Sequence, residues 1–194
     1  DAGSGKSTEL LNLFYKLKEE DSPYFPIFQK LNTITSDRGL DDFLPTWWNQ
    51  VQPEIVVIIW DGLDEVLSEQ FNEVVRKINY FSQKNPKIKV VISCRANFYE
   101  LPVNNSPGTL PDFAPYILDA LNHDSIKHYY SFTTAKSNGE DFIAEMWNRD
   151  LLDLASRPFF LSIICSHYNK ENKLPKERVF LFDMYIQNRM RLDE

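Results

Sequence analysis

Residues 55–65 are IVVIIWDGLDE, a run of six apolar residues followed directly by an acidic stretch. An apolar run without polar alternation is typical of a strand that helices cover on both faces of a parallel sheet. Ligands of α/β proteins bind outside the carboxyl ends of such strands, so Asp61 is well placed to contact one. This stretch therefore predicts both the fold class and the edge of the sheet that carries the site.

The segments on either side of this strand alternate between strand and helix patterns. Period-2 or fully apolar runs predict strands, and apolar residues at helical spacing predict helices. We expect strands at 25–31, 55–60, 89–94 and 116–121, and helices at 6–20, 41–50 and 71–81. Strands that alternate with helices indicate a parallel α/β sheet.

The character of the chain changes at about His123. Beyond it we find no convincing strand, and four helical segments follow one another at 124–130, 141–155, 158–168 and 176–192. The sequence therefore predicts an α/β domain at 1–122 and a small all-helical domain at 123–194.

Residues 1–8 are DAGSGKST, which fits the second part of a phosphate-binding loop, Gly-x4-Gly-Lys-Ser/Thr. Glycines let the backbone curl so that several amides face one anion, and the following helix directs its positive N-terminal end to the same place. In this interpretation Lys6 bridges the β- and γ-phosphates and Ser7 ligates Mg²⁺. The residues assigned to nucleotide binding are Gly3, Ser4, Gly5, Lys6, Ser7 and Thr8. The alternative is a Gly/Ser-rich turn that merely precedes a helix.

The first glycine of the loop pattern would fall one position before Asp1. We therefore expect the chain to begin inside its own phosphate loop, after the strand that launches such a loop. Without that strand, the 194 residues alone are expected to fold poorly.

The acidic stretch supplies the other half of the predicted site. Asp61 follows the apolar strand as a Walker B aspartate does, and we predict that it holds Mg²⁺ directly or through water. Asp64 or Glu65, with Glu65 preferred, is the predicted catalytic group that orients and deprotonates the attacking water. Arg95 follows the strand at 89–94 and is predicted to sense the γ-phosphate. An acidic helix cap and an ordinary surface arginine are the alternatives.

Composition excludes several classes of function. The net charge of −7 argues against a broad nucleic-acid-binding surface. No apolar run approaches the ~20 residues that span a bilayer. Cys94 and Cys165 lie in apolar runs without metal or redox spacing, which indicates buried, reduced thiols and a cytoplasmic protein. The three histidines have no partners at metal-ligand spacing.

Taken together, these motifs resemble the NACHT class of signalling NTPases, within the STAND division of AAA+-related P-loop proteins. The resemblance rests on GSGKST at 3–8, on DGLDE at 61–65 and on SCR at 93–95, and it extends over essentially the whole chain. Residues 154–161, LASRPFFL, resemble the family's segment ending in Asn-Pro-Leu-Leu-Leu, whose proline packs near the adenine. The resemblance thus assigns Pro158 to cofactor binding, although a plain helix-initiating proline fits equally well. Arg157 and Trp60 depart from the family pattern.

The resemblance implies an ATP/ADP- and Mg²⁺-dependent switch that hydrolyses ATP slowly and oligomerises on activation. Nucleotide would lie between the sheet edge and the helical domain. Sensor and effector modules would lie elsewhere in the full protein, and innate immune or antiviral defence is the usual setting. The preference for ATP over GTP comes from the resemblance only.

Two other functions stay open at this point. One is a phosphotransferase, although the 99–115 loop contains no arginine or lysine to form a basic lid. The other is a scaffold that binds nucleotide without turnover, because binding and hydrolysis use most of the same residues.

Overall fold

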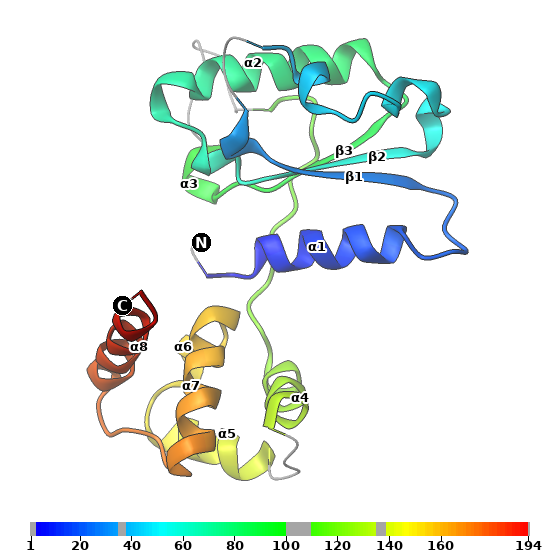
Figure 1. Ribbon diagram of the computed structural model, residues 1–194. Helices are drawn as coiled ribbons and strands as arrows, with labels where there is room; N and C mark the ends of the chain where they lie inside the picture. Colours follow the sequence, from blue (N-terminus) through cyan, green and yellow to red (C-terminus); the bar gives the residue numbers. More distant parts are fainter. Residues whose placement is uncertain (1–2, 35–37, 100–109, 135–138, 194) are drawn as a thin grey trace. The chain divides into compact units, whose positions relative to one another are not determined.

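A computed structural model describes residues 3–34, 38–99, 110–134 and 139–193. The chain divides into two compact units: Lys6–Tyr116, and Ile117–Glu194 together with Gly3–Gly5 (Figure 1). The first unit is an α/β structure and the second contains helices; each is described on its own below. Most of the 99–115 loop, which was discussed above as a possible basic lid, consists of residues 100–109. These residues lie outside the described part of the chain.

The first unit is built on three parallel strands: β1 (Phe25–Lys30), β2 (Val56–Asp61) and β3 (Lys89–Ile92). They lie in the order β1-β2-β3, with Lys30 opposite Asp61 and Trp60 opposite Ile92. The predicted α/β class with a parallel sheet is confirmed. The predicted strands at 25–31, 55–60 and 89–94 are present, with ends that differ by one or two residues.

Two helices cover opposite faces of this sheet, α1 (Lys6–Leu17) and α2 (Ser68–Lys84) (Figure 1). Every residue of β2 is buried, and alternate side chains point to opposite faces. Val57 and Ile59 pack with Leu10 of α1, whereas Ile58 and Trp60 belong to the core cluster on the α2 side. The alternation therefore brings Asp61 to the face that α1 covers.

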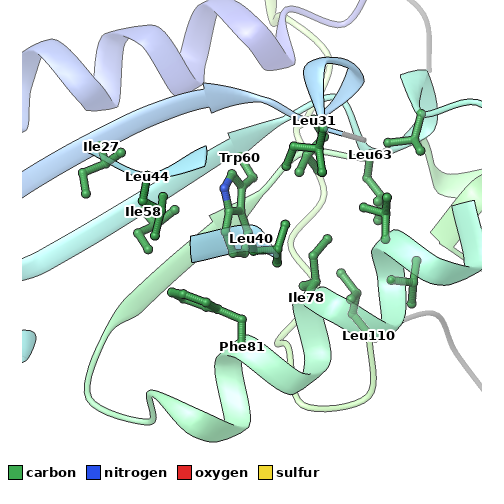
Figure 2. Close-up of a cluster of buried hydrophobic side chains, with 14 of the residues drawn as sticks. Ile27, Leu31, Leu40, Leu44, Ile58, Trp60, Leu63, Ile78, Phe81 and Leu110 are labelled. Atoms are coloured by element: carbon green, nitrogen blue, oxygen red, sulfur yellow. The ribbon is translucent and has the colours of Figure 1, made fainter. Parts of the chain in front are cut away.

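Trp60, which departs from the family pattern, fills the core instead of disturbing the site. Its side chain has no exposed area, and its ring centroid lies 5.3 Å from that of Phe81 on α2 (Figure 2). Leu31, Leu63 and Ile78 are also fully buried in this cluster. The indole thus lies on the face of the sheet opposite Asp61.

Two sequence predictions are wrong, one within this unit and one at the point where the chain passes to the second unit. The helix expected at 41–50 is replaced by two short 3-10 helices, Leu40–Phe43 and Trp48–Gln50, with Pro45, which has no N–H to donate, between them. The strand expected at 116–121 is absent, and Tyr116 and Ile117 are 92% and 89% exposed. A largely apolar segment forms no strand without a neighbouring strand to bond.

Other short elements connect the strands and helices of this unit. They are the 3-10 helices Leu31–Thr33, Pro53–Ile55 and Leu63–Glu65, and the single-turn helix α3 (Ala96–Tyr99). The first of these 3-10 helices follows β1 directly and the third follows β2 after Gly62, so both lie at the carboxyl edge of the sheet.

The second unit contains five helices among its described residues: α4 (His123–Thr134), α5 (Gly139–Asn148), α6 (Leu152–Ala155), α7 (Pro158–Glu171) and α8 (Arg178–Asp193). Its core includes Tyr130 stacked on Phe142, with ring centroids 4.2 Å apart. The helix expected over 141–155 is two helices, because Asp150 between them adopts a left-handed φ of 55°. Nowhere in the described ranges is a helix long and apolar enough to cross a membrane.

Neighbouring aromatic residues on α2 provide a test of this packing. Phe81 is 3% exposed and contacts Trp60, whereas Tyr80 is 67% exposed. We expect Phe81→Ala to lower the free energy of unfolding by about 3–5 kcal/mol, because it leaves a cavity in the core. The matched control Tyr80→Ala should change it by less than about 0.5 kcal/mol. Urea denaturation of both variants measures the difference, and equal losses would contradict the assigned faces of α2.

Candidate functional site at the carboxyl edge of the sheet

The buried polar centre of this edge joins the ends of β2 and β3. Asp61 is 4% exposed and Ser93 is 7% exposed. The Ser93 hydroxyl donates a hydrogen bond to Asp61 Oδ1 at 2.5 Å, and the Gly62 N–H donates to Ser93 Oγ at 2.8 Å. The backbone continues this link, since Ser93 N–H donates to the Trp60 carbonyl and Leu63 N–H to the Ser93 carbonyl. The Asp61 carboxylate is therefore fixed in place.

The turn after Asp61 requires glycine for two reasons. Gly62 has φ 81° and ψ 53°, a left-handed conformation that other residues rarely adopt. A Cβ atom at this position would also lie 3.0 Å from Cδ of Glu65. The Glu65 side chain thus folds back over the glycine.

Glu65 is held from the other side by a residue that the sequence did not indicate. Asn32, in the 3-10 turn after β1, donates a hydrogen bond from Nδ2 to Glu65 Oε2 at 3.1 Å. Glu65 itself is exposed to solvent. The preferred candidate for the general base therefore has a defined position at the open edge of the sheet.

Asp64 has a different environment from its neighbour. Its side chain is 5% exposed, and both carboxylate oxygens contact Arg95: Oδ2 lies 2.8 Å from Nε, and Oδ1 accepts the backbone N–H at 3.0 Å. Arg95 is 45% exposed. Asp64 therefore binds an arginine, while Glu65 remains accessible.

The predicted phosphate loop has the backbone conformation that its glycines allow. Gly3 and Gly5 adopt left-handed φ angles of 73° and 87°, and α1 begins at the next residue, Lys6. Ser7 and Thr8 in its first turn are exposed. Glycines of positive φ beside a helix N-terminus are typical of backbone nests that bind anions.

Gly3 and Gly5 also contact the start of α7, in the compact unit to which they belong. The Phe159 N–H donates to the Gly3 carbonyl at 3.3 Å. A Cβ at Gly3 would lie 2.9 Å from Cβ of Phe159, and one at Gly5 would lie 3.3 Å from Cγ of Pro158. Pro158, which the resemblance assigns to adenine contact, is the first residue of α7 and packs on a loop glycine. Its role as an adenine contact stays a prediction.

The pKa of the Cys94 thiol is affected by a residue from each of the two predicted motifs, Lys6 and Asp64. This pKa is raised to about 11, mainly by burial and also by the charge of Asp64, whereas Lys6 acts to lower it. Since both residues act on this thiol, they lie near the same end of β3. The thiol remains protonated at neutral pH and is not a nucleophile.

The structure thus brings Lys6, Asp61, Asp64, Glu65 and Arg95 to one end of the sheet. Sequence reasoning missed two residues with polar contacts there, Asn32 and Ser93. Asn32 is the polar residue that follows a predicted strand, the same signal that identified Asp61. Ser93 lies in the quoted SCR stretch and was given no role.

The described residues contain no group of three or more His, Cys, Asp and Glu side chains that could hold a metal ion by themselves. Ser7 and Asp61 are the two side chains that the sequence assigns to Mg²⁺, and this assignment stays a prediction.

No protein-family model matches this chain, and no curated protein matches it significantly. The resemblance to NACHT NTPases therefore rests on the residues and motifs quoted above.

The left-handed turn at Gly62 gives a direct test of the site geometry. Gly62→Ala forces an L side chain into a left-handed φ and against Glu65, so we expect the free energy of unfolding to fall by about 1–2 kcal/mol. Gly39 is a matched control, because its φ is −70° and an added Cβ would meet its nearest neighbour at 3.5 Å. Gly39→Ala should be neutral or slightly stabilising. Urea unfolding that ranks the two substitutions in the opposite order would contradict this turn.

Proposed function

We propose that the carboxyl edge of the sheet binds Mg²⁺ and ATP, and that the protein is a slowly hydrolysing switch of the NACHT type. The observation that carries the proposal is the buried Asp61 at the end of a fully buried strand, on the sheet face covered by α1. Lys6 begins that helix, directly after two glycines of positive φ. This combination fits a triphosphate and its metal better than it fits an ordinary helix cap.

The residues present fit a nucleotide in charge and in backbone conformation. The positive φ angles of Gly3 and Gly5 let successive amides face one anion. Asp61 Oδ1 accepts the Ser93 hydroxyl, and no hydrogen bond to Oδ2 is seen within the described ranges. That second oxygen is the one we assign to the metal, since Mg²⁺ takes oxygen ligands.

Each residue at the edge has a separate task in this proposal. Lys6 contacts the β- and γ-phosphates, and Ser7 and Asp61 bind the metal. A bound Mg²⁺ supplies neutralisation of the charge on the phosphates. Glu65, oriented by Asn32, accepts the proton of the attacking water. Arg95 contacts the terminal phosphate.

A switch must distinguish ATP from ADP. Moving a two-state equilibrium from 1:99 to 99:1 takes a difference in affinity of about 5.5 kcal/mol. Charge-assisted hydrogen bonds contribute about 1.5–3 kcal/mol each, so contacts from Lys6, Arg95 and the metal suffice. Oligomerisation, flanking sensor and effector domains, a cytoplasmic location and a part in defence signalling complete the proposal, and these rest on the family resemblance.

Nucleotide binding is tested by removing the phosphate-loop lysine. At an ATP concentration near 100 times the dissociation constant, binding stabilises the native state by about 2.7 kcal/mol. We expect Lys6→Ala to abolish the corresponding rise in melting temperature, because it removes the cation that contacts the phosphates. Lys16→Ala, in the last turn of the same helix, is the matched control and should retain the shift. An undiminished shift in the Lys6 variant would refute the phosphate-loop assignment.

Hydrolysis is tested separately at Glu65. Glu65→Gln keeps the shape of the side chain and its hydrogen bond from Asn32 but removes the proton acceptor. We expect the release of inorganic phosphate to fall by about 10²–10⁴-fold, with ATP affinity retained. Glu69→Gln, in the first turn of α2, is the control and should hydrolyse ATP normally. Retained turnover in Glu65→Gln would show that another group takes the proton.

A further inference from the structure

The contact between Asp64 and Arg95 suggests a function for Asp64 that differs from acid–base catalysis. The carboxylate uses both of its oxygens on the same residue: one accepts the Arg95 backbone N–H at 3.0 Å, and the other lies 2.8 Å from Nε. The side chain is only 5% exposed. Each oxygen therefore already has a partner on Arg95 and little contact with solvent, whereas the neighbouring Glu65 is exposed.

Asp64 holds Arg95 at its backbone N–H and at Nε, and the terminal part of the guanidinium is exposed. Guanidinium groups carry five N–H donors, and the Nε–H is directed to Asp64. For the two terminal nitrogens no partner is seen among the residues that the structure describes. The side chain is 45% exposed. A planar fork with fixed Nε and unused terminal N–H groups has the geometry that binds phosphate oxygens in pairs.

This pair differs from the exposed ion pairs of the same unit. In the Lys87–Glu54 pair the side chains are 68% and 55% exposed, and contacts of that kind contribute little. Asp64 is nearly buried, and it is bonded to the backbone of Arg95 as well as to its side chain. Asp64 therefore fixes the backbone position from which the Arg95 side chain extends, and it also neutralises the charge of the guanidinium.

We propose that Asp64 is the positioning residue for Arg95 and that it makes Arg95 the group that discriminates ATP from ADP. The inference rests on the proposed function, since it concerns the terminal phosphate of the same nucleotide. With Asp64 in place, the terminal nitrogens of Arg95 face a narrow range of positions. Without it, the guanidinium samples many positions and contacts the phosphate less often.

The test compares ATP and ADP affinities in Asp64→Asn. The asparagine carbonyl can still accept the backbone N–H of Arg95. The amide has no negative charge, and its nitrogen cannot accept the Nε–H. We expect the preference for ATP over ADP to fall roughly 10- to 100-fold, the range for a lost hydrogen bond to a charged group, with ADP affinity retained. Glu54→Ala is the control and should keep the preference of the unmodified protein. An unchanged preference in Asp64→Asn overturns the inference.

A double variant separates positioning from direct catalysis. In the Arg95→Ala background, Asp64→Asn should change neither the ATP preference nor turnover any further, because the residue that it positions is gone. A further loss of turnover would mean that Asp64 acts on its own and would overturn the inference. Equal losses of ATP and ADP affinity in Asp64→Asn would indicate a merely structural role, with the same consequence.

Two measurements keep the test independent of folding and of the proposed function. If Asp64→Asn does not fold, Arg95→Lys tests the same pairing, since lysine keeps the charge but has no Nε fork; it should lose the preference to a similar extent. Retention of the preference in Arg95→Lys would overturn the inference.

The Arg95 Nε–H resonance of the nucleotide-free protein should be protected from exchange and should lose that protection in Asp64→Asn. If the unmodified protein binds no nucleotide, the proposed function fails together with this inference; if it binds and hydrolyses ATP but ignores Asp64→Asn, only the inference fails.

Discussion

The hydrogen bond from Ser93 to Asp61 is the interaction on which the carboxyl edge depends. A carboxylate that is 4% exposed is costly unless polar partners replace the lost water. The Ser93 hydroxyl supplies one partner, and its oxygen in turn accepts the Gly62 N–H. This chain of bonds determines where β2 ends relative to β3, and the turn that follows starts from that point. The placement of Asp64 and Glu65 therefore depends on a serine in another strand.

The sequence predicted the fold where the physical signal was local. β2 is a strand covered on both faces, and the six consecutive apolar residues at 55–60 are typical of such a strand. The prediction was wrong at 41–50, where the apolar residues have helical spacing, because Pro45 cannot donate the hydrogen bond that a helix interior requires. It was also wrong at 116–121, a largely apolar segment that follows a Pro- and Gly-bearing loop. Whether a strand forms depends on a neighbour, and spacing along the chain contains no information about that neighbour.

For the candidate site, the sequence predicts which strand ends come together, but it does not predict the contacts between individual side chains. Parallel strands end at one edge, so the sequence predicts that Asp61 and Arg95 lie near each other. The contact of Asn32 with Glu65 joins residues 33 positions apart, and it depends on the direction of two side chains after two different strands. Likewise, the sequence gives no sign that Asp64 is nearly buried and Glu65 exposed. Such differences between adjacent residues of one chemical type are set by the geometry of the turn.

That geometry explains the separate environments of the acidic residues. Leu63–Glu65 is a 3-10 helix, in which successive side chains are about 120° apart around the axis. One turn thus points three side chains in three directions: Leu63 into the core, Asp64 toward Arg95 after β3, and Glu65 toward Asn32 after β1. An α-helical turn, at about 100° per residue, would spread them less evenly. The left-handed conformation of Gly62 orients this turn at the end of β2. The turn therefore gives neighbouring carboxylates different partners, with Asp64 paired to a cation and Glu65 accessible to water.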